Sequence, residues 1–409
     1  MEEWKSYRLG DIVRIGSGLA YKADYLGSGD ALLLGMGCVS FTEKFLKKGA
    51  RPYSGVSEER YFVSPGDIVL ATRQQSDNLP ILGMPAIIPN DYIGTRLIAG
   101  SNLYIVHNQS EIDNRFLFWL LKTPEYINHI SSCKTGTTVR MITKKDVESF
   151  VFKCPPKDER ERIANFLWTI EEKIDLNNRI NHNLEEQAQA LYKSWFVDFE
   201  PFKDGKFVDS ELGLIPAGWS VKSLGEVTKE IRDKVSARQD VKVLSPVTSG
   251  RLVLSEEFFT KQVFSESIAK YLLVKPGDFA YNPARVNIGS LGLNEYPFDG
   301  CVSPVYVVFR CESGYNHFFD LYRTTAPFKD EVLSRSSGGV RQTLAYKDFA
   351  LIRIVYPPRV VIESFNSLYE GLIAVQKSNL KENEILSSQR DSLLPLLMSG
   401  QVLCVDLNC

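Results

Sequence analysis

Short apolar runs alternate with turn-forming residues over roughly the first third of the chain. Runs such as residues 31–34, 68–71 and 103–106 are rich in Leu, Ile, Val and Ala, and Gly, Pro, Asn and Ser separate them. Apolar runs of this length, bounded by such residues, are typical of β-strands. The pattern therefore predicts a mainly β domain at the start of the chain.

The pattern changes after Pro155-Pro156. Residues 157–200 contain neither glycine nor proline, as an uninterrupted helix requires. Asp158 and Glu161 match a capping pair at its start. The stretch predicts one long helix from Asp158 to about Phe199, which at 1.5 Å per residue would span roughly 60 Å.

The whole pattern occurs twice. Trp4 to Ile12 returns as Trp219 to Val227, Pro65-Gly66-Asp67 as Pro276-Gly277-Asp278, Gly136 to Arg140 with Lys145-Asp146 as Gly338 to Arg341 with Lys347-Asp348, and Pro155-Pro156 as Pro357-Pro358. These matches keep their order along the chain, and their spacing changes only through insertions and deletions in loops. An ordered series of this kind indicates an internal duplication, so the chain contains two copies of one domain with its helix.

The two predicted helices share a seam of apolar positions at alternating steps of four and three, the spacing of a coiled coil. The second seam follows the first by 202 residues and repeats two asparagines, which fix register and partner at a cost in stability. The residues expected to pair the helices are Ile163, Leu167, Ile170, Ile174, Asn177, Asn181, Leu184, Leu191, Phe365, Tyr369, Leu372, Asn379, Asn383, Leu386 and Leu393. In a single copy, packing of the helix on its own domain would explain the stripe equally well. The matched asparagines favour an antiparallel coiled coil.

These elements predict an α+β fold with two similar mainly-β domains and flanking helices, joined by two long helices that form an antiparallel coiled coil. The expected boundaries are 1–157 for the first domain, 158–200 for the first long helix, 201–358 for a connector and the second domain, and 359–409 for the second long helix and tail.

Composition narrows the function classes. The chain has 409 residues, of which 44% are hydrophobic and 24% are charged. This amino-acid composition is typical of globular proteins and excludes a largely disordered chain. Its 48 basic and 50 acidic residues exclude a uniformly basic DNA coat, so any nucleic-acid surface is local. The start has no signal-like apolar segment, and no run reaches the roughly 18 residues of a membrane helix. We expect a cytoplasmic protein that does not interact with membranes.

The sequence contains no recognised catalytic or cofactor motif. There is no phosphate-binding Gly-x-x-x-x-Gly-Lys loop, and Gly35 and Gly37 lack the third glycine of a dinucleotide turn, because Ser40 stands there. Asn282-Pro283 begins like the box of adenine methyltransferases but lacks its stacking aromatic residue. Seven scattered cysteines and four histidines form no zinc pattern and fit reduced thiols. We expect no catalytic residue, metal site or cofactor in this chain.

Two similar domains on a stiff rod suit a linear target, and duplex DNA has the right dimensions. One segment of each copy carries Arg, Gln and Asn, which pair with guanine and adenine edges: Arg73, Gln74, Gln75 and Asn78 in the first, and Asn282, Arg285 and Asn287 in the second. A second segment combines cations with hydroxyls suited to phosphates: Lys134, Thr135, Thr137, Thr138 and Arg140, and Arg335, Ser336, Ser337, Arg341 and Gln342. Lys22, Arg51, Arg96 and Arg251 are weaker candidates for phosphate contacts. Ordinary polar surface loops are the alternative.

In this order, and duplicated, the motifs resemble those of the specificity subunit of a type I restriction–modification system. The resemblance rests on Leu9-Gly10-Asp11 and Leu224-Gly225-Glu226, the Pro-Gly-Asp turns, the glycine-to-arginine loops, the Pro-Pro pairs and the two long helices. It implies two target-recognition domains, each reading half of a split sequence in double-stranded DNA, and two helices that set the gap between the halves.

The resemblance further implies that this subunit is noncatalytic. Two methylation subunits would dock on the helices, motor/nuclease subunits would join the larger complex, and S-adenosylmethionine, ATP and Mg²⁺ would belong to those partners. The aromatic connector from Trp195 to Phe202 would be either a docking patch for a methylation subunit or a packing element against the neighbouring domain. The alternative function is a protein–protein adaptor whose two ligand-binding domains are spaced by a coiled coil.

Overall fold

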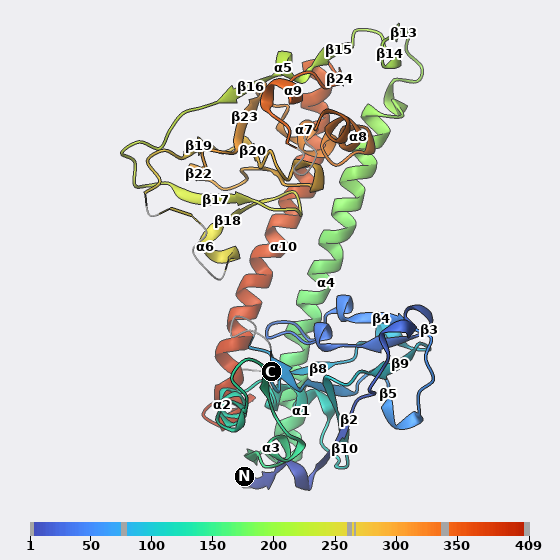
Figure 1. Cartoon of the computed structure of the whole chain (residues 1–409), viewed down its shortest axis with the longest axis vertical. Helices are drawn as coiled ribbons and strands as arrows, with labels where there is room; N and C mark the ends of the chain where they lie inside the picture. Colours follow the sequence, from blue (N-terminus) through green and yellow to red (C-terminus); the bar gives the residue numbers. More distant parts are fainter. Residues whose placement is uncertain (1–3, 75–79, 260–263, 266, 337–342, 405–409) are drawn as a thin grey trace. The chain divides into compact units, whose positions relative to one another are not determined.

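The computed structural model describes residues 4–74, 80–259, 264–265, 267–336 and 343–404 (Figure 1). Residue contacts divide the chain into two units. The first unit comprises Met1–Asn177 and Leu380–Cys409, and the second comprises Asn178–Asn379. Both units therefore contain parts of both long helices.

Two four-stranded sheets form the β part of the first unit within the described residues. One is antiparallel in the order β2-β10-β6-β8, and the other has the order β4-β3-β9-β5 with β3 and β9 parallel. The two-stranded ribbons are β1-β12 and β11-β7. The strands are β1 (Lys5–Arg8), β2 (Val13–Ser17), β3 (Leu26–Leu34), β4 (Ala50–Tyr53), β5 (Phe62–Val63), β6 (Ile68–Ala71), β7 (Arg73–Gln74), β8 (Pro85–Ile87), β9 (Arg96–Ala99), β10 (Leu103–Asn108), β11 (Arg140–Met141) and β12 (Val151–Cys154).

The second unit repeats this sheet topology. Its antiparallel sheet has the order β16-β23-β20-β21, and its mixed sheet has the order β18-β17-β22-β19 with β17 and β22 parallel. The ribbon β15-β24 corresponds to β1-β12, and β13-β14 is an added hairpin. The strands are β13 (Phe207–Ser210), β14 (Gly213–Pro216), β15 (Ser220–Ser223), β16 (Thr228–Ile231), β17 (Lys242–Pro246), β18 (Leu252–Leu254), β19 (Leu272–Val274), β20 (Phe279–Tyr281), β21 (Leu291–Leu293), β22 (Gly300–Val302), β23 (Val307–Cys311) and β24 (Arg353–Tyr356).

The helices also recur in the same order. They are α1 (Asn114–Leu120), α2 (Pro124–Cys133), α3 (Lys144–Glu148) and α4 (Lys157–Phe196), followed by α5 (Leu224–Val227), α6 (Ser255–Phe258), α7 (Asn316–Tyr322), α8 (Ala326–Arg335), α9 (Tyr346–Phe349) and α10 (Arg359–Ser399). Short 3₁₀ turns are η1 (Leu9–Asp11), η2 (Ala23–Tyr25), η3 (Met36–Cys38), η4 (Lys47–Gly49), η5 (Glu59–Tyr61), η6 (Asn90–Tyr92), η7 (Glu200–Phe202) and η8 (Val286–Ile288). Helices α1, α2, α3 and α4 thus correspond to α7, α8, α9 and α10.

Local capping explains part of the repeated sequence pattern. Thr123 and Thr325 cap α2 and α8 by accepting backbone N–H groups at the helix starts. Thr143 and Asp146 form a capping box at α3, which gives the Asp of the repeated Lys-Asp motif a structural role.

Each unit is completed by the C-terminal end of a long helix that begins in the other copy. Ile163 and Leu167 near the start of α4 share the first unit's core with Leu394 and Leu397 near the end of α10. In the second unit, Phe196 at the end of α4 packs on Phe365 near the start of α10, with ring centroids 4.8 Å apart. Each of these buried apolar side chains contributes roughly 1.5–3 kcal/mol to holding the helices in place.

The aromatic connector packs within the second unit. Helix α4 ends at Phe196 rather than near Phe199, which has a left-handed φ of 52°. The rings of Phe196, Phe199 and Phe202 lie 6.0, 5.4 and 5.1 Å from Trp219. The structure therefore favours the packing interpretation of this connector.

Candidate nucleic-acid interface

The structure brings together two predicted DNA-contacting segments of the first unit. Strands β7 and β11 pair antiparallel, so Arg140 lies opposite Gln74 and Met141 lies opposite Arg73. In sequence these residues are separated by most of the domain. The adjacency arises because β7 follows directly on β6, a central and fully buried strand of the antiparallel sheet.

The loop between Thr135 and Met141 is closed by hydrogen bonds. The Thr135 N–H donates to the Met141 carbonyl at 3.0 Å, and the Met141 N–H donates to the Thr135 carbonyl at 2.9 Å. The Arg140 guanidinium donates to the Gly136 carbonyl at 2.8 Å. Gly136 has a φ of +91°, and a Cβ there would lie 2.2 Å from the Val139 carbonyl oxygen, so glycine is required.

This closed loop presents polar side chains to solvent. Lys134, Thr135, Thr137 and Thr138 are exposed, and Arg140 is half-buried. Exposed hydroxyls and an ammonium group beside a tight backbone loop are suited to hydrogen bonds and ion pairs with phosphate oxygens.

The corresponding segments of the second unit are also tied together. The Leu344 N–H donates to the Pro283 carbonyl at 3.1 Å, and the Tyr281 hydroxyl donates to the Leu344 carbonyl at 3.2 Å. Arg285 is exposed on the turn after Pro283, while Asn287 is half-buried. In the second copy, a residue that directly follows one predicted segment thus contacts the other segment.

Several candidate side chains are engaged in local structure. The Gln74 amide oxygen accepts the Leu82 N–H at 3.3 Å, and the Asn282 amide oxygen accepts the Ala284 N–H at 3.0 Å. Arg335 forms an ion pair with Glu331 at 2.7 Å, and the Ser336 hydroxyl donates to the Val332 carbonyl at 2.6 Å. These contacts stabilise the turns and the end of α8. Gln75, Asn78, Ser337, Arg341 and Gln342 lie outside the described residues.

The four weaker phosphate candidates differ in their surroundings. Lys22 and Arg51 are exposed. The Arg96 guanidinium lies over the Phe62 ring at 4.5 Å, and Arg251 pairs with Glu185 of α4 at 3.4 Å. Arg251 is therefore already neutralised in this structure.

The two long helices lie side by side and antiparallel within each unit (Figure 1). In the first unit, Asn177 donates to Asn383 at 2.9 Å; in the second, Asn379 donates to Asn181 at the same distance. The 202-residue shift between the copies relates Asn177 to Asn379 and Asn181 to Asn383. The two hydrogen bonds are therefore equivalent in the duplicated structure.

The predicted seam residues of the two helices differ in how far they are buried. The buried ones are Ile163, Leu167, Ile170, Asn177, Asn181, Phe365 and Tyr369, and the half-buried ones are Ile174, Leu184, Leu191, Leu372, Asn379, Asn383, Leu386 and Leu393. Sequence reasoning missed the ion pair between Glu171 and Arg390, whose side chains are only 5% and 7% exposed. The signal was a charged residue, Arg390, at a seam position of the second helix.

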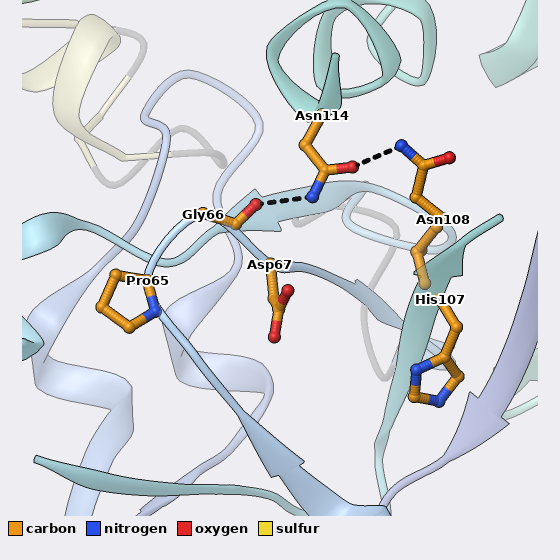
Figure 2. Close-up of a pocket in the computed structure, with 7 residues that line it drawn as sticks. Pro65, Gly66, Asp67, His107, Asn108 and Asn114 are labelled. Atoms are coloured by element: carbon orange, nitrogen blue, oxygen red, sulfur yellow. Dashed lines mark hydrogen bonds between the residues drawn. The ribbon is translucent and has the colours of Figure 1, made fainter. Parts of the chain in front are cut away.

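The repeated Pro-Gly-Asp motif is a structural turn. Gly66 and Gly277 have φ values of +88° and +84°, and the following aspartates accept the N–H groups of Ser64 and Lys275 at 2.8 and 2.9 Å. In the first unit the turn borders a pocket of about 580 Å³ (Figure 2). Figure 2 shows Asn114 donating to the Gly66 carbonyl, a bond of 2.9 Å that ties α1 to the turn.

Cys38 of the first unit and Cys301 of the second are fully buried. Burial raises the pKa of the Cys38 and Cys301 thiols to about 12, so both are packing groups rather than nucleophiles. Within the described ranges, no three His, Cys, Asp or Glu side chains cluster as metal ligands. Over the same ranges, no helix combines the length and apolar character needed to cross a bilayer.

The fold defines a duplicated α+β protein whose two similar units share a pair of long antiparallel helices. Residues 1–186 match the model of the type I restriction modification DNA specificity domain. The chain is 27% identical over 304 residues to the MjaIX type I restriction enzyme specificity subunit of Methanocaldococcus jannaschii, covering 71% of this chain and 69% of that one. It is 23% identical to the HindI specificity subunit of Haemophilus influenzae, covering 98% and 100% of the two chains.

A solved type I restriction–modification S subunit from M. genitalium has the same fold, with a TM-score of 0.57, 14% identity and coverage of 97% and 96% of the two chains. The chain thus resembles type I restriction–modification specificity subunits, in sequence along almost its whole length and in fold. It is thus a DNA specificity subunit, a noncatalytic class whose activity lies in partner subunits.

Proposed function

We propose that each unit reads one half of a bipartite target in double-stranded DNA. The supporting observation is that β7 and β11, from two polar segments distant in sequence, pair in the first copy, and that Leu344, just beyond the corresponding segment of the second copy, bonds to Pro283. Such a paired arrangement sets base-reading side chains beside phosphate-binding ones. Arg73 and Arg285 are the strongest candidates for guanine contacts, because both are exposed, whereas Arg335 is paired with Glu331.

The long helices would set the gap between the two half-sites. Helices α4 and α10 have 40 and 41 residues, and each runs without interruption from one unit into the other. Their polar pairs disfavour a slipped register, because a shift would leave a buried asparagine facing an apolar side chain.

The helices would also dock the partner subunits. Leu176 of α4 and Val375 and Ile385 of α10 are apolar and 46%, 46% and 50% exposed. We propose that two methylation subunits cover such residues, that motor/nuclease subunits join them, and that S-adenosylmethionine, ATP and Mg²⁺ are bound by these partners. The protein–protein adaptor remains the second candidate.

The test is DNA binding by the chain assembled with its methylation subunit, at stated salt concentrations. Arg73→Ala should weaken binding by about 1–3 kcal/mol and relax specificity at one position, because it removes a base contact. Lys134→Ala should weaken binding equally on all DNA sequences. It should also lower the slope of log K against log salt by about 1, because one phosphate contact is lost. Lys153→Ala, an exposed lysine on β12, is the control. An adaptor would tolerate all three changes.

The spacing function has a separate test. Inserting seven residues, one heptad, at equivalent positions of α4 and α10 should lengthen the gap between methylated half-sites without changing either half. Mapping of methylated adenines in cells that carry the variant measures both. An unchanged gap would mean that the helices do not determine the spacing.

A further inference from the structure

A hollow in the second unit combines cations with aromatic rings. It has a volume of about 430 Å³, and its lining includes Arg232, Lys234, Lys270, Tyr306 and Tyr346. None of these residues is predicted from the sequence to contact DNA, because they come from separate segments between residues 230 and 346.

The hollow borders the Asn282–Asn287 segment, which we propose to contact DNA in the second half-site, and Thr343, which follows Gln342 in the sequence. Pro283, at the start of the Asn282–Asn287 segment, lines it directly. Thr343 also lines it, and its neighbour Leu344 is hydrogen-bonded to the Pro283 carbonyl. A DNA strand that reaches Arg285 would therefore pass close to this hollow.

The charge balance of the hollow favours an anion. Arg232 is neutralised by Glu230 at 2.9 Å. Lys234 and Lys270 are exposed, and neither forms an ion pair with any other residue in the described part of the chain. A backbone bridge between Lys234 and Leu272 brings the segments of the two lysines together. Two unneutralised ammonium groups in one concave surface raise the local concentration of anions.

The tyrosines add an apolar wall with fixed geometry. The Tyr346 hydroxyl donates to the Thr228 carbonyl at 3.0 Å, which holds its ring beside the edge strand β16. Tyr306 is half-buried and lies in the segment just before β23. Such a wall beside cations suits a sugar-phosphate backbone, because the phosphate oxygens pair with cations and the sugars offer apolar faces.

We infer that this hollow binds backbone phosphates of one DNA strand in the second half-site, with Lys234 and Lys270 as the phosphate ligands. The inference rests on the proposed DNA-reading function and extends it to residues outside the two predicted segments. The 215-residue shift that relates the starts of the two copies places Ile15, Ser17 and Leu19 opposite Glu230, Arg232 and Lys234. The contact therefore belongs to one half-site and makes the electrostatic contribution of the two halves unequal.

The experiment compares a double variant with two controls in the assembled complex. Lys234→Gln with Lys270→Gln should weaken binding at least about tenfold near physiological salt, equally on cognate and mismatched DNA, and lower the slope of log K against log salt by about 2. Lys234→Arg with Lys270→Arg keeps the charges and should retain the slope. Lys229→Gln changes an exposed lysine of the same strand segment that does not line the hollow, and should change neither quantity.

The possible outcomes distinguish a failure of this inference from a failure of the proposed DNA-reading function. If the unaltered complex shows no sequence preference, the proposed DNA-reading function fails. If the unaltered complex is specific and the glutamine variant keeps its affinity and salt slope, only the hollow's role fails. Relaxed sequence preference without a change in slope would overturn the phosphate assignment as well, because it would indicate base contacts. Hydrogen exchange of the second unit verifies that each variant is folded.

Discussion

The two units share their sheet topology but differ in the chemistry where α4 and α10 meet. In the first unit a buried ion pair joins Glu171 to Arg390. The equivalent positions in the second unit, 202 residues away in each helix, are Ile373 and Ala188. One copy thus has a charged layer where the other has an apolar one. Backbone topology survived the duplication, whereas the residues that pair the helices diverged.

The same contrast occurs beside the Pro-Gly-Asp turns. In the second unit Arg310 forms a two-pronged ion pair with the buried Asp278, with bonds of 2.6 and 2.9 Å. In the first unit Asp67 and His107 instead line the pocket of Figure 2. Ion pairs inside a protein stabilise only as complete pairs, because each partner offsets the desolvation of the other. The charged sites should therefore be the sensitive ones.

The largest effect is expected from Arg390→Ala. Removing the guanidinium leaves Glu171 buried without its cation, which should lower the free energy of unfolding of the first unit by about 3–5 kcal/mol. Hydrogen exchange of the α10 segment in the first unit measures this loss. The double change Glu171→Ile with Arg390→Ala installs the layer of the second unit and should cost much less. Equal losses for the single and double variants would refute the pairing argument.

The next effect is a pH dependence confined to the first unit. Burial lowers the pKa of the Lys122 ammonium to about 8. Because the unfolded lysine titrates near 10.4, the unfolded state binds more protons between these values, so stability rises with pH there. The rise is at most about 1.4 kcal/mol per pH unit, and about 3 kcal/mol in total.

Lys122→Met isolates this contribution. The variant should lack the rise between pH 8 and 10, while both proteins follow the same trend below pH 7. Urea unfolding at several pH values, analysed as the difference between the two proteins, is the measurement. Parallel curves over the whole range would contradict the prediction. Thr324 lies at the equivalent position of the second unit, so no such lysine effect is expected there.

A smaller effect is expected at the second unit's ion pair. Arg310→Ala leaves Asp278 buried, but the arginine side chain is 45% exposed, so water replaces part of the interaction. We expect a loss of about 2 kcal/mol in the second unit. His107→Ala, beside the corresponding aspartate of the first unit, should change stability by less than about 0.5 kcal/mol. Thermal unfolding of both variants tests the difference, and a larger loss for the histidine variant would reverse our comparison.

The smallest effect concerns the asparagine pairs. Replacing Asn177 and Asn383 together by leucine should change stability by about 1 kcal/mol or less, and in the stabilising direction, because apolar seams pack better than polar ones. What the leucine variant should lose is a unique helix register. Cross-linking of cysteines introduced on α4 and α10 measures how many registers are populated. A single register in the leucine variant would show that the asparagines do not specify it.

The sequence alone determined the duplication, the mainly β character of each copy and the presence of the two long helices, although α4 ends three residues before the predicted Phe199. The hydrophobic period, the turn residues and, for α4, the absence of glycine and proline are local properties of the chain, so they can be recognised in the sequence. The repeated asparagines also predicted the antiparallel partner, since a polar seam position has meaning only in a pair.

Only the tertiary structure decided which distant segments meet. The pairing of β7 with β11, the burial of Glu171 on Arg390 and the hollow around Lys234 and Lys270 each join residues separated by tens to hundreds of positions. The engaged side chains of Asn282 and Arg335 likewise emerged only from their neighbours. Sheet order and helix packing create these contacts, and local sequence preference carries little information about either.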